Sequence, residues 1–170
     1  MKIYISFFGT IRYFTPNMIP VSTAGGCGWP WWLLKADKHK EGDFYLNKNN
    51  VIIGIQEEKF SCSDFFEELE EKCQKNCPYK DKVPHYQFMD AYYKHLCSLN
   101  FNELIKDWER VAEDVRKINH YEGEPIIVLM VYEGTDCNCA ERPVLQRWFK
   151  DNGYELKEWT KDLIIDDCIF

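Results

Sequence analysis

Side chains that could carry chemistry gather in a short segment of the last third of the chain. Glu133, Cys137 and Cys139 precede a helical pattern that starts near Glu141 and Arg142. A thiol near a helix amino terminus ionises readily and can be nucleophilic, while a carboxylate can act as a base or bind a ribose hydroxyl. This combination predicts Glu133 and Cys139 as catalytic candidates, and Arg142 and Glu141 as ligand-binding candidates.

A strand and a helix must position these residues. Residues 126–131 are apolar at every position, which is typical of a strand buried on both faces of a parallel sheet. Residues 141–152 then have helical spacing, and Gly153 is expected to end that helix. Because ligands bind beyond the carboxyl ends of parallel strands, this unit predicts the place of a site without naming a reaction.

Arg142 can be interpreted in two ways. It falls in the first turn of the predicted helix, where unpaired backbone N–H groups and the helix dipole favour an anion. Its guanidinium could bind a phosphate or carboxylate with two hydrogen bonds. In the alternative, Arg142 pairs with Glu133 or Glu141 and only organises the loop.

The cysteines also leave alternatives open. The Cys-x-Cys pair, Cys137 and Cys139, could supply a catalytic thiol, bind zinc or be chemically inert. Zinc needs four converging ligands, and the close thiol pairs are Cys73 with Cys77 and Cys137 with Cys139. We therefore predict no metal site, and the sequence names no cofactor.

A glycine-rich and tryptophan-rich stretch near the amino terminus is the second candidate region. Its glycines and prolines exclude a regular helix or a central strand, so a loop is expected. Its rings could form a stacking wall for a base or sugar, and its glycines would let a ligand approach the backbone. The alternative is a loop whose rings only pack over the core. The ligand-binding candidates here are Trp29, Trp31, Trp32, Gly25 and Gly26.

The charge distribution limits the choice of partner. The net charge of −7 disfavours binding to duplex nucleic acid. Residues 1–40 nevertheless hold five Lys or Arg against one Asp, which suits a small anion or a single nucleic-acid strand. Scattered, solvated lysines are the alternative interpretation. No apolar run approaches the roughly 18 residues that cross a bilayer, and the start does not resemble a leader, so we expect a cytoplasmic protein without a membrane partner.

The remaining pattern predicts the fold. The expected elements alternate between strands and helices, and residues 1–170 should therefore form a single α/β domain. We predict a three-layer, Rossmann-like arrangement with a mostly parallel central sheet, residues 126–132 in its centre and helices on both faces. Asn100 or Asn102 should cap the helix over 104–118, and Cys62, Cys97 and Cys168 should be small core or near-core residues. Further strands are expected at 3–8, 20–23, 51–55 and 154–159, and further helices from Ser61 and from Pro84.

Three blocks of the sequence resemble the short branch of the domain-of-unknown-function family numbered 488. The first block joins the strands near residues 3–8 and 19–22 to a Pro-Trp pair, and the second is Phe88-Met89-xx-Tyr92-xxx-Leu96. The third is the apolar strand ending in Tyr132-Glu133, followed by a loop and then by Arg142, Trp148, Gly153 and Glu158. The resemblance implies an α/β fold and a site around Arg142, but it implies no particular reaction.

The chain departs from that family at three positions near the site. Val131 stands where the family has a cysteine, Glu141 stands where it has a histidine, and Cys139 is one residue early. Chemistry that depends on the histidine is therefore expected to be absent or changed.

Two functions are predicted from these features. The first is binding, and conceivably processing, of a small phosphate-bearing or nucleotide-type ligand at the carboxyl end of the 126–132 strand. The alternative is a non-catalytic module that binds a protein or single-stranded nucleic acid through the Trp-rich basic segment.

Overall fold

The computed structural model describes residues 1–24, 54–62, 65, 83–118, 120–132 and 141–161. Within these residues five strands form one sheet of order β3-β2-β4-β1-β5, and every neighbouring pair is parallel. The parallel α/β fold predicted from the sequence is therefore confirmed. The strands are β1 (Lys2–Phe7), β2 (Met18–Ser22), β3 (Ile55–Gln56), β4 (Ile126–Val131) and β5 (Lys157–Glu158).

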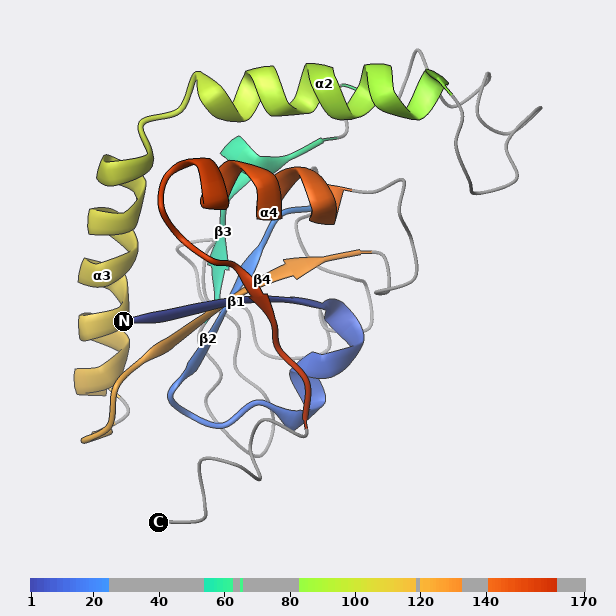
Figure 1. The fold of residues 1–170 in the computed structure, drawn as a ribbon. Coiled ribbons are helices and arrows are strands. Elements are labelled where there is room, and N and C mark those ends of the chain that lie inside the picture. Colours follow the sequence, from blue (N-terminus) through green and yellow to red (C-terminus); the bar gives the residue numbers. More distant parts are fainter. Residues whose placement is uncertain (25–53, 63–64, 66–82, 119, 133–140, 162–170) are drawn as a thin grey trace.

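Strand β4 lies in the centre of the sheet, as its apolar sequence predicted (Figure 1). It pairs with β1 on one side and with β2 on the other, and its last five side chains are all buried. Ile127, Leu129 and Val131 enter the core cluster on one face, whereas Val128 and Met130 enter the cluster on the other. A strand without polar side chains suits this position because neither face meets water.

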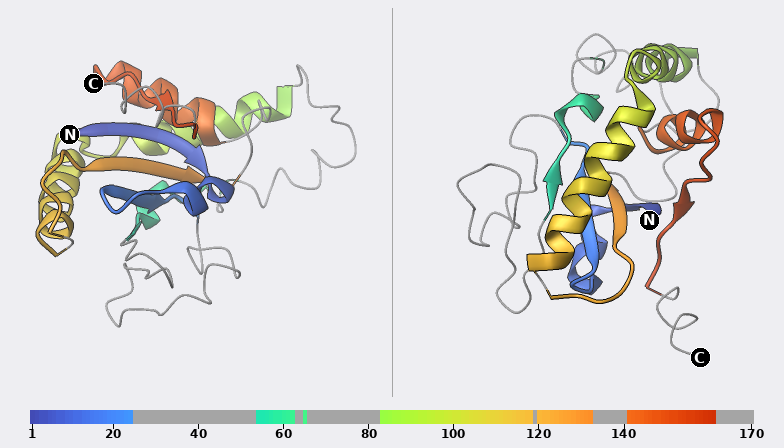
Figure 2. Two further views of the ribbon diagram at one scale, coloured as in Figure 1. Left: turned by 90° about the horizontal axis from the view of Figure 1, so that it is seen from below. Right: turned by 90° about the vertical axis from the view of Figure 1, so that its left-hand side faces the viewer.

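Among the described residues, three α helices contribute to the larger core cluster: α2 (Val83–Cys97), α3 (Phe101–Ile118) and α4 (Glu141–Asp151). α2 packs against α4, and α3 lies beside the amino ends of β1 and β4 (Figures 1 and 2). The helical side chains buried in this cluster include Tyr92, Leu96, Leu104, Trp108, Leu145 and Phe149.

The opposite face of the sheet is covered by the 3-10 helix η1 (Phe8–Tyr13) and by the segment after β5. Ile11 and Phe14 pack there with Met130 and Trp159, and the rings of Phe14 and Trp159 are 4.9 Å apart at their centroids. Helical segments thus lie on both faces, as predicted. Among the described residues, η1 is the helix that covers this face, and it is a short 3-10 helix.

The ends of two helices follow the predicted signals. Asn100 precedes α3, and its side-chain oxygen accepts a hydrogen bond from the backbone N–H of Glu103 at 3.2 Å, so Asn100 rather than Asn102 is the cap. After α4, Gly153 has a φ of 83°, a left-handed conformation that favours glycine. The chain then turns into β5, which is an edge strand as expected.

Some predicted details differ from the structure. Cys97 was expected in or near the core, but its side chain is exposed at the last residue of α2, where the helix ends. Phe8 begins η1 instead of ending β1. The predicted strand residues 51–53 and most of the helix after Ser61 lie outside the described residues.

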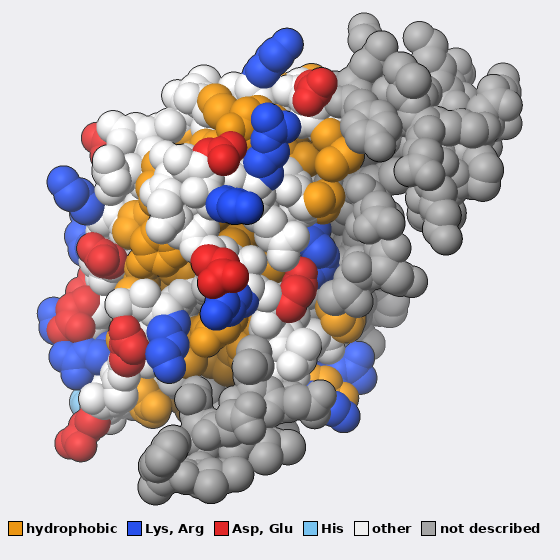
Figure 3. All heavy atoms as spheres, in the orientation of Figure 1, with side chains coloured by type: hydrophobic (Ala, Val, Ile, Leu, Met, Phe, Trp, Pro, Cys, Tyr) orange, Lys and Arg blue, Asp and Glu red, His pale blue; other side chains and the backbone are white. Residues whose placement is uncertain are grey.

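The surface over α3 carries both signs of charge. Asp107 pairs with Arg110, and Glu113 pairs with Arg116 and Lys117. Figure 3 shows acidic and basic side chains interspersed over this part of the molecule. None of the helices in the described part of the chain is long and apolar enough to cross a membrane.

Candidate functional site

Buried polar side chains of the described residues share one location in the fold. All of them lie in the last residues of a strand, directly after a strand, or in the first turn of the helix that follows one. Because every strand is parallel, these positions meet at the carboxyl edge of the sheet, which Figure 1 shows beside η1 and the start of α4. The buried polar side chains are Ser6, Thr10, Ser22, Thr23, Glu141 and Arg142.

The topology makes the carboxyl ends of β2 and β4 the expected place for a ligand. β2 and β4 are neighbours in the sheet. The strand that comes after β2 in the sequence, β3, lies on one side of this pair, and the strand that comes after β4, β5, lies on the other side, beyond β1. Connections that leave adjacent strands in opposite directions open a crevice between them. The backbone N–H of Thr23 bonds to the carbonyl of Met130 across this point at 3.2 Å.

Glu141, at the start of α4, is held by groups from two other parts of the chain. Its side chain is only 3% exposed. The Thr23 hydroxyl donates to Oε1 at 2.7 Å, and the Cys62 thiol donates to Oε2 at 3.2 Å. Burying a carboxylate is costly unless hydrogen bonds compensate. Thr23 and Cys62 therefore fix Glu141 in one orientation at the start of α4.

Arg142 forms an ion pair that the sequence did not predict. Its guanidinium binds Glu158 of β5, and Gln146 donates a further hydrogen bond to Glu158 at 3.3 Å. The pairing partners proposed from the sequence were Glu133, which lies outside the described residues, and Glu141, which instead contacts Thr23 and Cys62. Arg142 is 4% exposed and joins α4 to the edge strand β5.

Two residues at the start of α4 affect how an anion could bind there. Glu141 already places a carboxylate in the first turn, where it interacts favourably with the helix dipole. Pro143 has no backbone N–H to offer a ligand. An anion would therefore bind more tightly at this edge of the sheet if further cationic side chains contacted it.

Gln56, at the end of β3, carries a buried acceptor. Its Nε2 donates to the carbonyl of Ala24 at 2.7 Å, which ties β3 to the end of β2. Its Oε1 is buried, and no donor in the described structure reaches it. Buried acceptors normally have a partner, so this oxygen is a place where a ligand donor would be stabilising.

A second polar group lies at the end of β1. The hydroxyls of Ser6 and Thr10 are 2.9 Å apart, and the Ser6 hydroxyl donates to the carbonyl of Trp159 at 3.1 Å. The Thr10 hydroxyl also donates to the carbonyl of Phe7 at 2.8 Å. These bonds fix the turn from β1 into η1.

Exposed aromatic side chains accompany this edge. Phe7, the last residue of β1, is 37% exposed, and Tyr132, which follows β4, is 76% exposed. β1 and β4 are neighbours, and Phe7 pairs with Val131. Two solvent-accessible rings therefore lie at the ends of adjacent strands. Tyr13, at the end of η1, is also exposed.

Several predicted site residues cannot be placed relative to these groups. They lie outside the described residues: Glu133, Cys139, Trp29, Trp31, Trp32, Gly25 and Gly26. Of the predicted set, the structure brings Glu141 and Arg142 to the carboxyl edge, as expected.

Sequence reasoning missed four members of the site. Cys62 packs against the core, which confirms its interpretation as a core or near-core residue, but its hydrogen bond to Glu141 was not predicted. Thr23 was assigned only to a strand, and Gln56 and Glu158 were not considered as site residues. The available signal was a polar residue that ends a predicted strand, as Thr23 does, or directly follows one, as Gln56 does.

Metal binding has little support among the placed side chains. No group of three or more His, Cys, Asp or Glu residues within the described ranges could hold a metal ion. The thiols considered for zinc, at positions 73, 77, 137 and 139, lie outside those ranges, so the prediction of no metal site remains a prediction.

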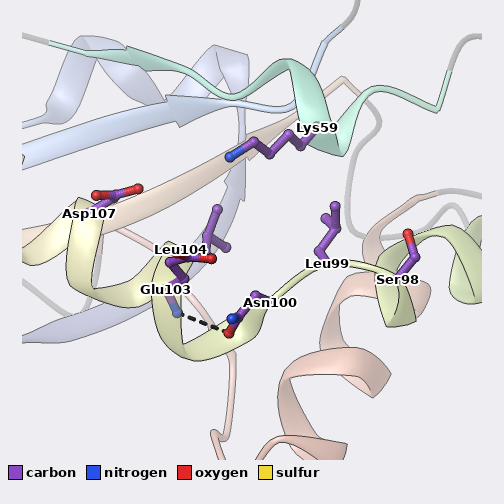
Figure 4. Close-up of a pocket in the computed structure, with 7 residues that line it drawn as sticks. All are labelled: Lys59, Ser98, Leu99, Asn100, Glu103, Leu104 and Asp107. Atoms are coloured by element: carbon purple, nitrogen blue, oxygen red, sulfur yellow. Dashed lines mark hydrogen bonds between the residues drawn. The ribbon is translucent and has the colours of Figure 1, made fainter.

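A separate hollow of about 330 Å³ lies between η2 (Glu58–Phe60) and the start of α3. Figure 4 shows Lys59 on one side and Glu103 and Asp107 on the other. Most of its lining side chains are exposed, and none belongs to the polar group at the carboxyl edge. Its full lining is Lys59, Ser98, Leu99, Asn100, Glu103, Leu104 and Asp107.

Comparisons with known proteins add no relative. No family model matches the chain, and neither the curated proteins nor the solved structures include a significant match. The resemblance to the domain-of-unknown-function family therefore remains an expectation.

Proposed function

We propose that the protein binds a small phosphate-bearing, nucleotide-type ligand at the carboxyl ends of β1, β2 and β4. The observation that carries this proposal is the position of the buried polar side chains along the carboxyl edge of the sheet, which includes the point where the connections from β2 and β4 diverge. A core made only for stability has no need of hydroxyls and a carboxylate at one edge, because each must be compensated by hydrogen bonds.

The chemistry of the crevice fits the sugar or base of such a ligand. Glu141 and the Oε1 atom of Gln56 are acceptors, and both are buried. Ribose hydroxyls and exocyclic amines are donors. A donor that reaches Gln56 would recover about 1–3 kcal/mol, the usual cost of leaving a buried acceptor without a partner.

The remaining groups fit a planar ring and an anion. The exposed rings of Phe7 and Tyr132 are suited to stacking on a base. Arg12 in η1 and Arg142 in α4 both follow the carboxyl end of a strand, on opposite faces of the sheet, and arginine is well suited to phosphate.

A thermal-shift panel tests the proposal. Nucleoside mono-, di- and triphosphates are added to the wild-type protein. A ligand present at 100 times its Kd should raise stability by about 2.7 kcal/mol. If no nucleotide raises the unfolding temperature, the proposal is wrong.

A matched pair of variants places the site. Thr23→Val keeps the side-chain volume but removes the hydroxyl that orients Glu141. It should reduce the ligand-induced shift, whereas Thr15→Val, at an exposed threonine bonded to Asn17, should leave the shift unchanged. Equal shifts in both variants would place the ligand elsewhere.

A further inference from the structure

Arg12 differs from the other arginines in its electrostatic surroundings. The chain has five arginines, and four of them form ion pairs with a carboxylate. The Arg12 side chain is exposed, and no carboxylate of the described residues pairs with it. An uncompensated guanidinium on a chain of net charge −7 is an available anion contact.

The Arg12 guanidinium is held in place by its own helix. Its Nε donates to the carbonyl of Gly9 at 2.8 Å, and its central carbon is 5.7 Å from the centroid of the Tyr13 ring. The bond to Gly9 uses one of the five guanidinium N–H donors. The donors of the two Nη groups remain for a phosphate, and the side chain is already oriented.

The Phe7 ring lies next to this guanidinium. A Cβ atom placed on Gly9 would lie 2.7 Å from Cε2 of Phe7 and 3.8 Å from Nη2 of Arg12. The ring and the cation therefore approach the same side of Gly9. Only a residue without a side chain allows Phe7 to lie this close.

These contacts lie within reach of the rest of the carboxyl edge. Phe7 ends β1, Tyr132 follows β4, and Thr23 follows β2. Neighbouring strands are about 4.8 Å apart, so the ends of β1 and β2 are separated by roughly 10 Å. A single nucleotide can extend over that distance.

We propose that Arg12 binds the phosphate of the nucleotide and that its base stacks on Phe7. The inference rests on the proposed function and assigns the phosphate to Arg12 rather than to Arg142. Arg142 is buried, and its Nη1 is bound to the carboxylate of Glu158, whereas the Arg12 side chain is exposed. Arg142 then has a positioning role, since it fixes α4 against β5.

Calorimetric titration of ligand pairs tests the two contacts separately. Adenosine, guanosine, cytidine and uridine monophosphates are titrated into the wild-type protein, and the tightest is compared with its own nucleoside. Arg12→Gln should weaken binding of the monophosphate by about tenfold or more, as expected for a hydrogen bond to a charged group. The same variant should bind the nucleoside as the wild type does.

The ring contact has a different signature. Phe7→Leu should weaken binding of the nucleotide and of the nucleoside by about fivefold or more, because both carry the base. Gly9→Ala should have a similar effect, since a new Cβ would displace the Phe7 ring. Circular dichroism confirms that each variant is folded.

Arg147→Gln is the matched control. Arg147 is another exposed arginine beside a tyrosine ring, 4.0 Å from the centroid of Tyr93, and it belongs to α4. This variant should bind both ligands as the wild type does. If the wild type binds a nucleotide and Arg12→Gln binds it equally well, the inference is wrong and the proposed function stands. If the wild type binds none of the four, both are wrong.

Discussion

The hydroxyl of Thr23 donates a 2.7 Å hydrogen bond to Oε1 of Glu141, a residue 118 positions later in the chain. The bond joins the end of β2 to the start of α4 across the carboxyl end of β4. It connects the two sides of the crevice in which we place the ligand.

Removing this hydroxyl should destabilise the protein even without ligand. Thr23→Val leaves Glu141 Oε1 buried without its donor, and this should lower the free energy of unfolding by about 1–3 kcal/mol. Urea denaturation followed by circular dichroism measures the change. Thr15→Val, at an exposed position, should stay within about 0.5 kcal/mol of the wild type. Equal costs at the two positions would show that the Thr23–Glu141 bond is not specially stabilising.

The ion pair between Arg142 and Glu158 should be worth more than a surface pair. Glu158→Gln keeps the shape of the side chain but leaves a buried guanidinium without its carboxylate, at a cost of about 1.5–3 kcal/mol. Glu155→Gln breaks the exposed pair with Lys157 and should cost at most about 1 kcal/mol. The same denaturation assay compares them, and a larger loss for Glu155→Gln would contradict this assignment.

Tyr93 should make stability depend on alkaline pH. A hydrogen bond to the carboxylate of Asp151, at 2.5 Å, together with the neighbouring Cys97, raises the pKa of Tyr93 to about 12. The folded state thus favours the neutral phenol. Its stabilising contribution should be complete below pH 10 and should disappear as the pH rises through 12.

Unfolding midpoints across this pH range test the Tyr93 contact. Tyr93→Phe should be less stable than the wild type below pH 10, and the difference should close between pH 10 and 12. Asp151→Asn should abolish most of that pH dependence, because it removes the carboxylate that is the main cause of the shift. A difference that stays constant with pH would contradict the prediction.

The sequence predicted those parts of the fold that depend on local patterns. The unbroken apolar run made β4 recognisable as a buried central strand, and Gly153 marked the end of α4. These signals are local. A strand buried on both faces needs apolar residues at every position, and a left-handed turn after a helix favours glycine.

The contacts within the site depend on strand order, which local patterns do not contain. Thr23 reaches Glu141 only because β2 lies beside β4, and Arg142 reaches Glu158 only because β5 lies beyond β1. Cys62 shows the same limit. Its residue type predicted a core or near-core position, which is confirmed, but only the folded chain shows that its thiol donates to a buried carboxylate.

Backbone NMR during a nucleotide titration tests the central claim most directly. We predict that the largest amide shift changes fall at the carboxyl ends of the strands, at Phe7 and Gly9, at Thr23 and Ala24, and at Tyr132 and Arg142. Changes that gather instead around Lys59, Ser98 and Asp107, which line the separate hollow beside α3, would contradict the account. A spectrum unchanged by every nucleotide would contradict it as well.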